Sequence, residues 1–289
     1  MFLTDRKLER RIAELKEYRY RDIINLNEFT VQEDTQGVVN PVLPEVFTGW
    51  DTLRVGDTWK GRDLFLWMHR VIQVPAEWKG KKIVGIFDFG NTGAGNNAGF
   101  ESMLYLNGKM YQGVDANHKE VFFDDTYCGT NMYVTFRLWS GLEGGGVPTP
   151  QEHRIARADL AWLDEEVDDF YYLASMVWET IKELDEFNPV QHDLRKALDT
   201  ACHCIDWAYP GSDTFYESVH EADHLLNESI DSMDKKSSVN IRCVGHTHID
   251  VAWLWRLKHT REKCSRSFTT VLRLMEQYPL YLTQIMQLG

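Results

Sequence analysis

Residues 103–113, MLYLNGKMYQG, decide how the first half of the chain is interpreted. Two short apolar runs, Met103–Leu106 and Met110–Gly113, flank the pair Asn107-Gly108. Asn-Gly accepts the positive φ angles of a type I′ turn, which is the tight turn that joins two antiparallel strands. The stretch therefore predicts a β-hairpin and indicates an antiparallel β-fold around it.

Further short apolar runs bounded by turns lie on both sides of this hairpin. They are Leu64–Val74, which Pro75 ends, and Lys82–Phe89, Val121–Phe123 and Met132–Leu138. Short strands at this spacing are typical of a β-sandwich or jelly roll, which we predict for residues 31–150, with Trp67, Trp78 and Trp139 mostly buried. The glycine-rich stretch 90–99 fits neither phosphate-binding fingerprint and is predicted to be a loop.

The residues before the predicted sandwich have helical periodicity. Over residues 4–26, the apolar side chains of Leu8, Ile12, Leu15 and Ile23 recur on one side, which predicts an amphipathic helix. We assign residues 1–30 to this N-terminal helix and leader. Residues 30–50 lack a period and are predicted to form an extended connector.

A break follows the predicted sandwich. Three glycines, Gly144–Gly146, precede Pro148 and Pro150, and beyond them the apolar period becomes helical. We predict a helical linker of residues 151–236. Its three helices are expected over residues 163–184, 189–208 and 215–230, and Asn188-Pro189 is expected to cap and open the second.

The last segment, residues 237–289, changes pattern again. A buried strand is predicted at residues 239–244, a helix at 257–278 and a second strand at 280–286. Strand, helix, strand is the opening of a parallel α/β domain, and one or two parallel strands cannot bury both faces of a sheet. We therefore expect the front part of a longer α+β multidomain protein, ending in a truncated α/β barrel.

The composition excludes several classes of function. The chain has 289 residues, 43% of them hydrophobic, and its formal net charge of −13 repels phosphate backbones, so nucleic acid is not an expected partner. No apolar run approaches the roughly 20 residues that span a bilayer, and the N-terminus has no apolar signal region. Five cysteines without framework spacing favour a reducing compartment. We expect a cytoplasmic protein, which could be a homo-oligomer.

The strongest candidate site is Gly245–Asp250, GHTHID, followed by Trp253. It comes directly after a predicted buried strand, where α/β barrels carry their sites. Alternate residues of an extended chain point to one side, so His246, His248 and Asp250 would project together. Imidazole and carboxylate ligands suit Zn²⁺ or a similar divalent ion. The alternative is a strand-end cluster that only forms hydrogen bonds.

Two other clusters compete with this site. His220–His224, HEADH, matches the H-E-x-x-H pattern of zinc peptidases, in which the two histidines share a helix face. A peptidase also needs a third ligand and a cleft, and this helix lies in the predicted linker, so we predict a structural segment. Cys202–Cys204, CHC, would point its thiols apart on a helix and is predicted to be packing.

The sequence around the candidate site reads HTHIDVAWLWR over residues 246–256 and continues with Lys258, Arg261, Arg266–Phe268 and Tyr278-Pro279. These residues resemble the start of the catalytic domain of glycoside hydrolase family 38, the retaining, zinc-dependent α-mannosidases. The upstream region is similar to a subgroup with cytosolic, vacuolar and bacterial members, in which a helical leader and a β-sandwich precede the catalytic barrel. Its matching residues are Trp67–Trp78 with Val74-Pro75, Asn107-Gly108, Gln112–Asp115 and His118.

The resemblance implies roles for three residues. His248 and Asp250 match the family's two N-terminal zinc ligands, and Trp253 matches the aromatic residue that stacks on the bound mannose. His246, which the spacing alone would have admitted, matches a histidine that is not a ligand. The family's nucleophile, acid/base carboxylate and other two zinc ligands fall beyond Gly289, so no catalytic residue is assigned.

Three hypotheses follow. The first is the N-terminal portion of a zinc-dependent α-mannosidase that acts on α-mannosides or mannose-containing oligosaccharides, inactive as a fragment. The second is a metallohydrolase of the amidohydrolase kind, whose first strand also ends in His-x-His, although the Trp-x-Trp after the motif favours a sugar site. The third is a noncatalytic carbohydrate-binding or assembly module.

Overall fold

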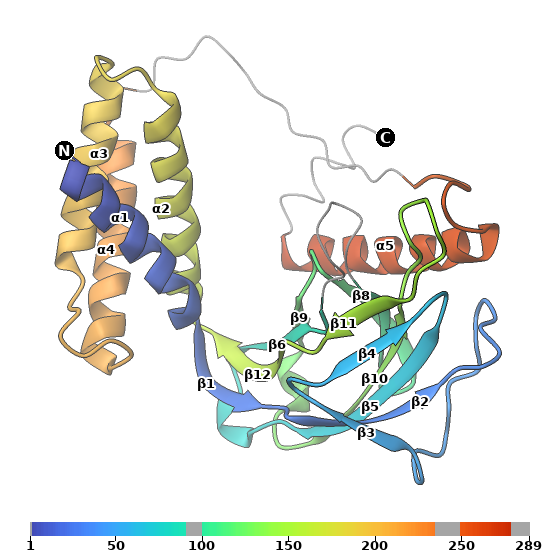
Figure 1. Ribbon diagram of the computed structural model, residues 1–289. Coiled ribbons are helices and arrows are strands. Elements are labelled where there is room, and N and C mark those ends of the chain that lie inside the picture. Colours follow the sequence, from blue (N-terminus) through green and yellow to red (C-terminus); the bar gives the residue numbers. More distant parts are fainter. Residues whose placement is uncertain (1, 91–99, 235–248, 279–289) are drawn as a thin grey trace. The chain divides into compact units, whose positions relative to one another are not determined.

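The computed structural model describes residues 2–90, 100–234 and 249–278 and divides into two compact units (Figure 1). The helical unit comprises Met1–Asp22 and Trp162–Asn240, and the sandwich unit comprises Ile23–Ala161 and Ile241–Gly289. Both units combine segments that lie far apart in the sequence. The chain is thus an α+β protein. Among its described helices, none is both long and apolar enough to cross a membrane.

Four helices form the helical unit, and Figure 1 shows them side by side. They are α1 (Phe2–Tyr18), α2 (Glu165–Glu183), α3 (Pro189–Cys204) and α4 (Asp213–Asp231). The side chains of Asp164, Asn188 and Ser212 cap the N-termini of α2, α3 and α4 by accepting backbone N–H bonds, as such residues do. The predicted helical periods and the Asn188-Pro189 start are confirmed.

The helices of this unit share one apolar core. Its centre includes Leu8 and Leu15 of α1, Phe170 of α2, Leu198 of α3 and Phe215 of α4, each fully buried. Burial of such a side chain stabilises the fold by about 1.5–3 kcal/mol. The N-terminal helix therefore belongs to the same core as the helices that follow residue 162.

The predicted N-terminal helix ends earlier than expected. Residues 4–26 were predicted to be helical, but α1 ends at Tyr18 and strand β1 covers Tyr20–Asn25. β1 lies beside β12 in a sheet, and the backbone N–H of Leu26 donates to the carbonyl of Ala158 at 2.8 Å. Pairing with a strand some 130 residues away overrides the helical period, because it satisfies the backbone groups equally well.

Three sheets make up the β-structure. The six-stranded sheet has the order β3-β2-β5-β10-β7-β8, the four-stranded sheet β1-β12-β6-β9 and the two-stranded sheet β11-β4. The remaining strand bounds are β2 Glu28–Glu33, β3 Asp51–Arg54, β4 Thr58–Gly61, β5 Phe65–Gln73, β6 Lys82–Asp88, β7 Glu101–Leu106, β8 Lys109–Asp115, β9 Glu120–Phe123, β10 Asn131–Trp139, β11 Gln151–Arg154 and β12 Arg157–Leu163. Short 3₁₀ turns cover Ala76–Trp78 and Asp125–Tyr127.

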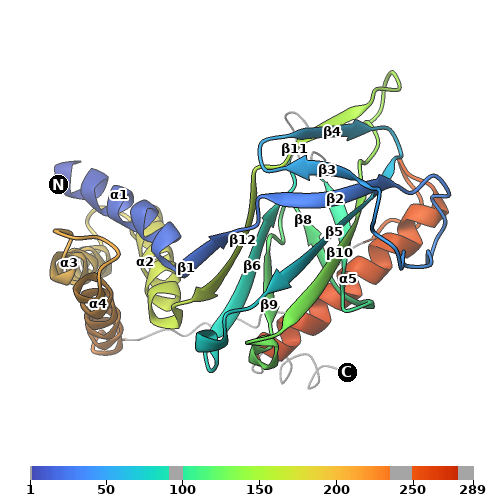
Figure 2. The same cartoon turned by 90° about the horizontal axis from the view of Figure 1, so that it is seen from below.

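The four- and six-stranded sheets face one another across a core of phenylalanine rings. Phe87 of β6 and Phe136 of β10 lie 4.8 Å apart between ring centroids, and Phe89 lies 4.9 Å from Phe136 and 6.0 Å from Phe29 of β2. Figure 2 shows β2, β5 and β10 side by side, as their antiparallel pairing requires. The predicted burial of Trp67, Trp78 and Trp139 is confirmed: their relative exposures are 5%, 2% and 4%.

The hairpin predicted from residues 103–113 is present. β7 pairs antiparallel with β8, with Leu106 opposite Lys109, and Asn107 and Gly108 have φ angles of 49° and 81°. These are the positive values that a type I′ turn requires. The strands predicted at residues 64–74, 82–89, 121–123 and 132–138 correspond to β5, β6, β9 and β10.

The segment boundaries in the structure differ from the predicted ones. β1 and β2 begin before residue 31, and β11 and β12 lie within the segment assigned to the helical linker, residues 151–236. β11 pairs with β4, placing His153 opposite Trp59, so the chain returns to the sheets after Pro150 before its helices begin.

The helix predicted at residues 257–278 is present as α5, Leu257–Gln277. Three other predicted segments lie outside the described residues: the strands at 239–244 and 280–286 and the loop at 91–99.

Candidate functional site

The structure describes half of the predicted site. His246 and His248 lie outside the described residues, whereas Asp250 and Trp253 lie in the irregular segment 249–256 that leads into α5. We call residues 249–256 the motif segment. Asp250 is half-buried, and Trp253 is 58% exposed. A sugar stacks on an indole through its apolar C–H face, so the exposed ring of Trp253 is open to such a contact.

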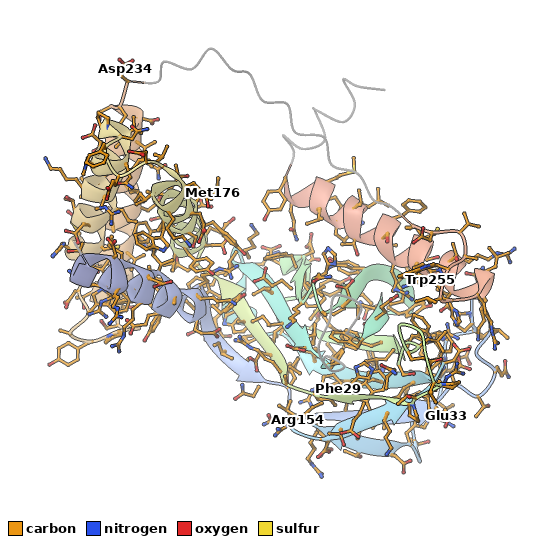
Figure 3. The ribbon with its side chains drawn as sticks, turned by 45° about the horizontal axis from the view of Figure 1, so that its top comes forward. Phe29, Glu33, Arg154, Met176, Asp234 and Trp255 are labelled. Atoms are coloured by element: carbon orange, nitrogen blue, oxygen red, sulfur yellow. The ribbon has the colours of Figure 1, made fainter. Side chains whose placement is uncertain are left out.

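The motif segment is fastened to the first turn of α5 by Thr260. Its hydroxyl donates to the carbonyl of Val251 at 2.5 Å and accepts a hydrogen bond from the Trp255 indole Nε1 at 3.1 Å. Trp255, which lies close to α5 (Figure 3), holds Trp253 edge-to-face with ring centroids 5.5 Å apart. The position of Trp253 therefore depends on the position of α5.

His259 fixes the start of α5. The backbone N–H of Arg256 donates to His259 Nδ1 at 3.0 Å, so Nδ1 carries no proton and the neutral ring bears its proton on Nε2. Nε2 then donates to Asp63 Oδ1 at 2.6 Å. The ring is 1% exposed, and this burial lowers the pKa of His259 below its usual value, in agreement with a neutral imidazole.

Asp63 lies in the turn between β4 and β5 and receives several donors. Besides His259, the Trp139 indole Nε1 donates to Asp63 Oδ1 at 3.0 Å, and Lys258 Nζ lies 3.2 Å from Oδ2. Burial by itself would raise the pKa of Asp63, but the hydrogen bonds from Trp139 and His259, together with the charge of Lys258, outweigh it and lower the pKa. Asp63 is therefore a carboxylate that joins the sandwich to α5.

Two further groups of ion pairs, one around Glu101 and one around Arg137, contact the same helix. Glu101 of β7 pairs with both Lys263 and Arg266. Arg137 of β10, 4% exposed in its side chain, pairs with Asp34 at 2.7 Å and with Glu262. We call these contacts, with the Asp63–His259 bond, the ionic seam.

The helix approaches the sheet closely at β8. Gly113 donates its backbone N–H to Thr270 Oγ1 at 3.2 Å. A Cβ at residue 113 would stand 2.9 Å from that oxygen and 3.0 Å from Arg266 Cβ. Only glycine leaves room for α5 at this distance.

The residues of the ionic seam were not identified from the sequence. Asp63, Glu101 and Arg137 are separated from their partners on α5 by 125 to 196 positions, and no local period connects them. One signal was available: the side of α5 that carries His259, Glu262 and Arg266 is polar, while the opposite side carries Phe268 and Leu272. A helix that packs on its polar side requires charged partners.

The competing clusters have other contacts. His220 Nε2 lies 2.9 Å from Oδ1 of Asp164, the residue that caps α2, and His224 is 75% exposed in its side chain, 3.5 Å from Glu228. Within the described ranges, no group of three or more His, Cys, Asp or Glu could hold a metal ion. That the H-E-x-x-H segment is structural stays a prediction.

The prediction that Cys202 is a packing residue is confirmed, because Cys202 lies in the helical core, where burial raises the pKa of its thiol to about 12.

The donor chemistry of the motif fits a zinc site in part. His248 and Asp250 occupy alternate positions and offer one imidazole and one carboxylate, both of them common zinc ligands. Zinc sites use four ligands, or three and a water. These two residues therefore fit as half of a ligand set.

Comparison of the sequence with known proteins gives matches to alpha-mannosidases. Residues 238–286 match the N-terminal domain of glycosyl hydrolases family 38. Alpha-mannosidase G of Dictyostelium discoideum is 25% identical over 74% of this chain and 20% of its own length, and human alpha-mannosidase 2C1 is 24% identical over 79% of this chain and 22% of its own. Alpha-mannosidase of Saccharomyces cerevisiae is 28% identical over 48% of this chain and 14% of its own length.

The chain spans about a fifth of the length of the first two relatives. Among solved structures, a β-glucuronidase of Faecalibacterium prausnitzii aligns with 49% of this chain and 31% of its own at 12% identity, with a TM-score of 0.35.

Proposed function

We propose that this chain is the N-terminal portion of a zinc-dependent, retaining α-mannosidase, because residues 238–286 match the N-terminal domain of glycosyl hydrolases family 38 and the similar proteins are alpha-mannosidases. The alpha-mannosidase relatives support a glycoside hydrolase that acts on α-mannosides or mannose-containing oligosaccharides. The observation that carries the proposal is the motif segment, in which an exposed indole and a carboxylate three residues apart are held on a fixed helix start.

In this proposal, three residues of the chain face the substrate and the metal. His248 and Asp250 would hold the zinc ion, which supplies a template that binds sugar hydroxyls and favours a distorted ring. Trp253 would orient the sugar by contact with its C–H face. Thr260 keeps Trp253 in place through Trp255 and the carbonyl of Val251.

Retaining glycosidases need two carboxyl groups about 5–5.5 Å apart, one as nucleophile and one as acid/base. We assign neither role within residues 1–289. We therefore propose that the 289-residue chain does not hydrolyse mannosides by itself and binds zinc weakly, since it supplies only two ligands.

The proposal is tested by comparing two lengths of the protein. The 289-residue chain should release no product from an aryl α-mannoside, whereas a protein extended along its reading frame to the length of the relatives should hydrolyse it and hold one zinc. Asp250→Ala should remove both properties from the extended protein, and Asp57→Ala, a change in an exposed turn of the same sandwich unit, should remove neither. Turnover by the short chain, or an extended protein without zinc, would contradict the proposal.

We also propose a cytoplasmic location. Four cysteines of the described chain, Cys128, Cys202, Cys204 and Cys264, are free thiols, as expected in a reducing compartment. Fractionation of cells that produce the protein, with an antibody to the helical unit, tests this location.

A further inference from the structure

The motif segment has no regular secondary structure of its own. Its hydrogen bonds with α5 lie in the first turn of that helix, where Thr260 bonds to Val251 and Trp255 and His259 bonds to the backbone of Arg256. The side chain of Arg256 also lies 3.9 Å from the Asp63 carboxylate. The geometry of Asp250 and Trp253 is therefore set by whatever fixes that turn.

α5 rests on the sandwich with its polar side. His259, Thr260, Arg266 and Thr270 are its buried residues, whereas Leu257, Phe268 and Leu272 are more than half exposed. An apolar contact is non-directional and lets a helix rotate or slide. Hydrogen bonds and ion pairs depend on angle and distance, so this contact sets both the rotation and the register of α5.

Among the contacts of the ionic seam, Asp63 meets the helix nearest to the motif segment. Its carboxylate accepts from His259 Nε2 at 2.6 Å and from Trp139 Nε1 at 3.0 Å, and Trp139 stacks on the His259 ring with centroids 4.6 Å apart. The imidazole is thus clamped between Asp63 on one nitrogen and the Arg256 N–H on the other. The hydrogen-bonded path from Asp63 to the motif segment therefore runs through one side chain, that of His259.

We propose that Asp63 is a positioning residue of the candidate mannosidase site: acting through His259, it fixes the N-terminal turn of α5 and thereby the placement of Asp250 and Trp253. This inference rests on the proposed function for its role in zinc and sugar binding. It assigns the β-sandwich a task in the site, as the support on which the metal- and sugar-binding residues are held.

The first test measures the positioning directly in the 289-residue chain, without metal or substrate. Asp63→Asn removes the charge, and whichever way the amide turns, its NH₂ group faces a donor: His259 and Trp139 at the Oδ1 position, or Lys258 at the Oδ2 position. Backbone hydrogen exchange at Arg256 and in the first turn of α5 should become about tenfold faster, while β5 and β10 keep their protection. A matched control is Glu143→Gln, which breaks the adjacent ion pair with Arg62 and should leave α5 unchanged.

Substitutions of His259 show whether Asp63 acts through it. His259→Ala should speed exchange as Asp63→Asn does, and adding Asp63→Asn to it should have a much smaller effect than in the parent, because only the contacts of Asp63 with Lys258 and Arg256 are left to lose. His259→Gln should retain protection, since its amide oxygen can accept from the Arg256 N–H and its NH₂ can donate to Asp63. If Asp63→Asn does not fold, the pair His259→Ala and His259→Gln carries the same test. Unchanged exchange in folded Asp63→Asn or His259→Ala overturns the inference.

The second test uses the extended protein and separates this inference from the proposed function. Asp63→Asn should release zinc to a chelator about tenfold faster and lower kcat/KM for an aryl α-mannoside, and Glu143→Gln should do neither. If the unsubstituted extended protein holds no zinc and cleaves no mannoside, the proposed function fails while the exchange result still decides the positioning. If exchange speeds up but zinc release and kcat/KM stay unchanged, the role of Asp63 in the site is overturned.

Discussion

Helices α2 and α5 are buried in opposite ways. α2 turns Val167, Phe170, Ala174, Val177 and Ile181 into an apolar core, whereas α5 buries His259, Thr260, Arg266 and Thr270 and leaves Phe268 and Leu272 exposed. Apolar burial depends mainly on the area removed from water. Polar burial depends on each partner's angle and charge. The helical core is therefore suited to stability, and the ionic seam is suited to placing a segment accurately.

The largest effect is expected in the apolar core. Phe170→Ala should destabilise the helical unit by about 3–5 kcal/mol, because it removes a fully buried ring and leaves a cavity. Urea unfolding followed by circular dichroism measures the loss. Met176 lies on the same helix, where Figure 3 labels it, and its side chain is 68% exposed. Met176→Ala should change stability by no more than about 0.5 kcal/mol. Equal effects of the two substitutions would refute the assignment of the core.

In the ionic seam, the largest loss should come from charge removal. Arg137→Leu should cost about 3 kcal/mol, because it leaves the carboxylates of Asp34 and Glu262 buried without their partner. Arg137→Lys keeps the charge but loses the two-nitrogen contact with Asp34, so its cost should be smaller. Denaturant titration of both variants ranks them. A leucine variant as stable as the parent would show that the seam contributes little to folding.

A smaller effect should follow from crowding between α5 and β8. Gly113→Ala should cost about 1–3 kcal/mol and speed exchange along the middle of α5, since the new Cβ meets Thr270 Oγ1 and Arg266. Lys109→Ala, at an exposed position of the same strand, serves as the control. If Gly113→Ala preserves the protection of α5, the close approach of helix and strand is wrong.

The smallest effect is a dependence on pH in the seam but not in the apolar core. Burial lowers the pKa of His259, whose charged neighbours are Asp63, Lys258 and Arg256, so the unfolded state binds a proton more readily than the folded one. Stability is then fully present above the unfolded pKa of about 6.5 and falls as the pH drops through it, by at most about 1.4 kcal/mol per pH unit.

Exchange at the start of α5 should accordingly speed up between about pH 7 and pH 5, after correction for the intrinsic pH dependence of exchange. His259→Gln should remove this dependence, since glutamine does not titrate. If exchange in the His259→Gln variant still depends on pH, the dependence arises from a titratable group other than His259.

The sequence predicted the elements that depend on neighbouring residues. Asn107-Gly108 made the hairpin predictable because a type I′ turn needs positive φ at both residues. Asn188-Pro189 made the start of α3 predictable because the cap and the first position act within one turn. The alternate spacing of His246, His248 and Asp250 predicts a metal site, and this stays a prediction.

Only the tertiary structure decided which distant residues meet. β1 replaced the end of a predicted helix because its partner β12 lies about 130 residues away, and β11 lay within a predicted helical segment because it pairs with β4. Asp63 and His259 are 196 positions apart, so no period or spacing relates them. Short-range patterns record turn angles and helix faces, whereas a carboxylate and an imidazole become partners only when the sheet and α5 are packed together.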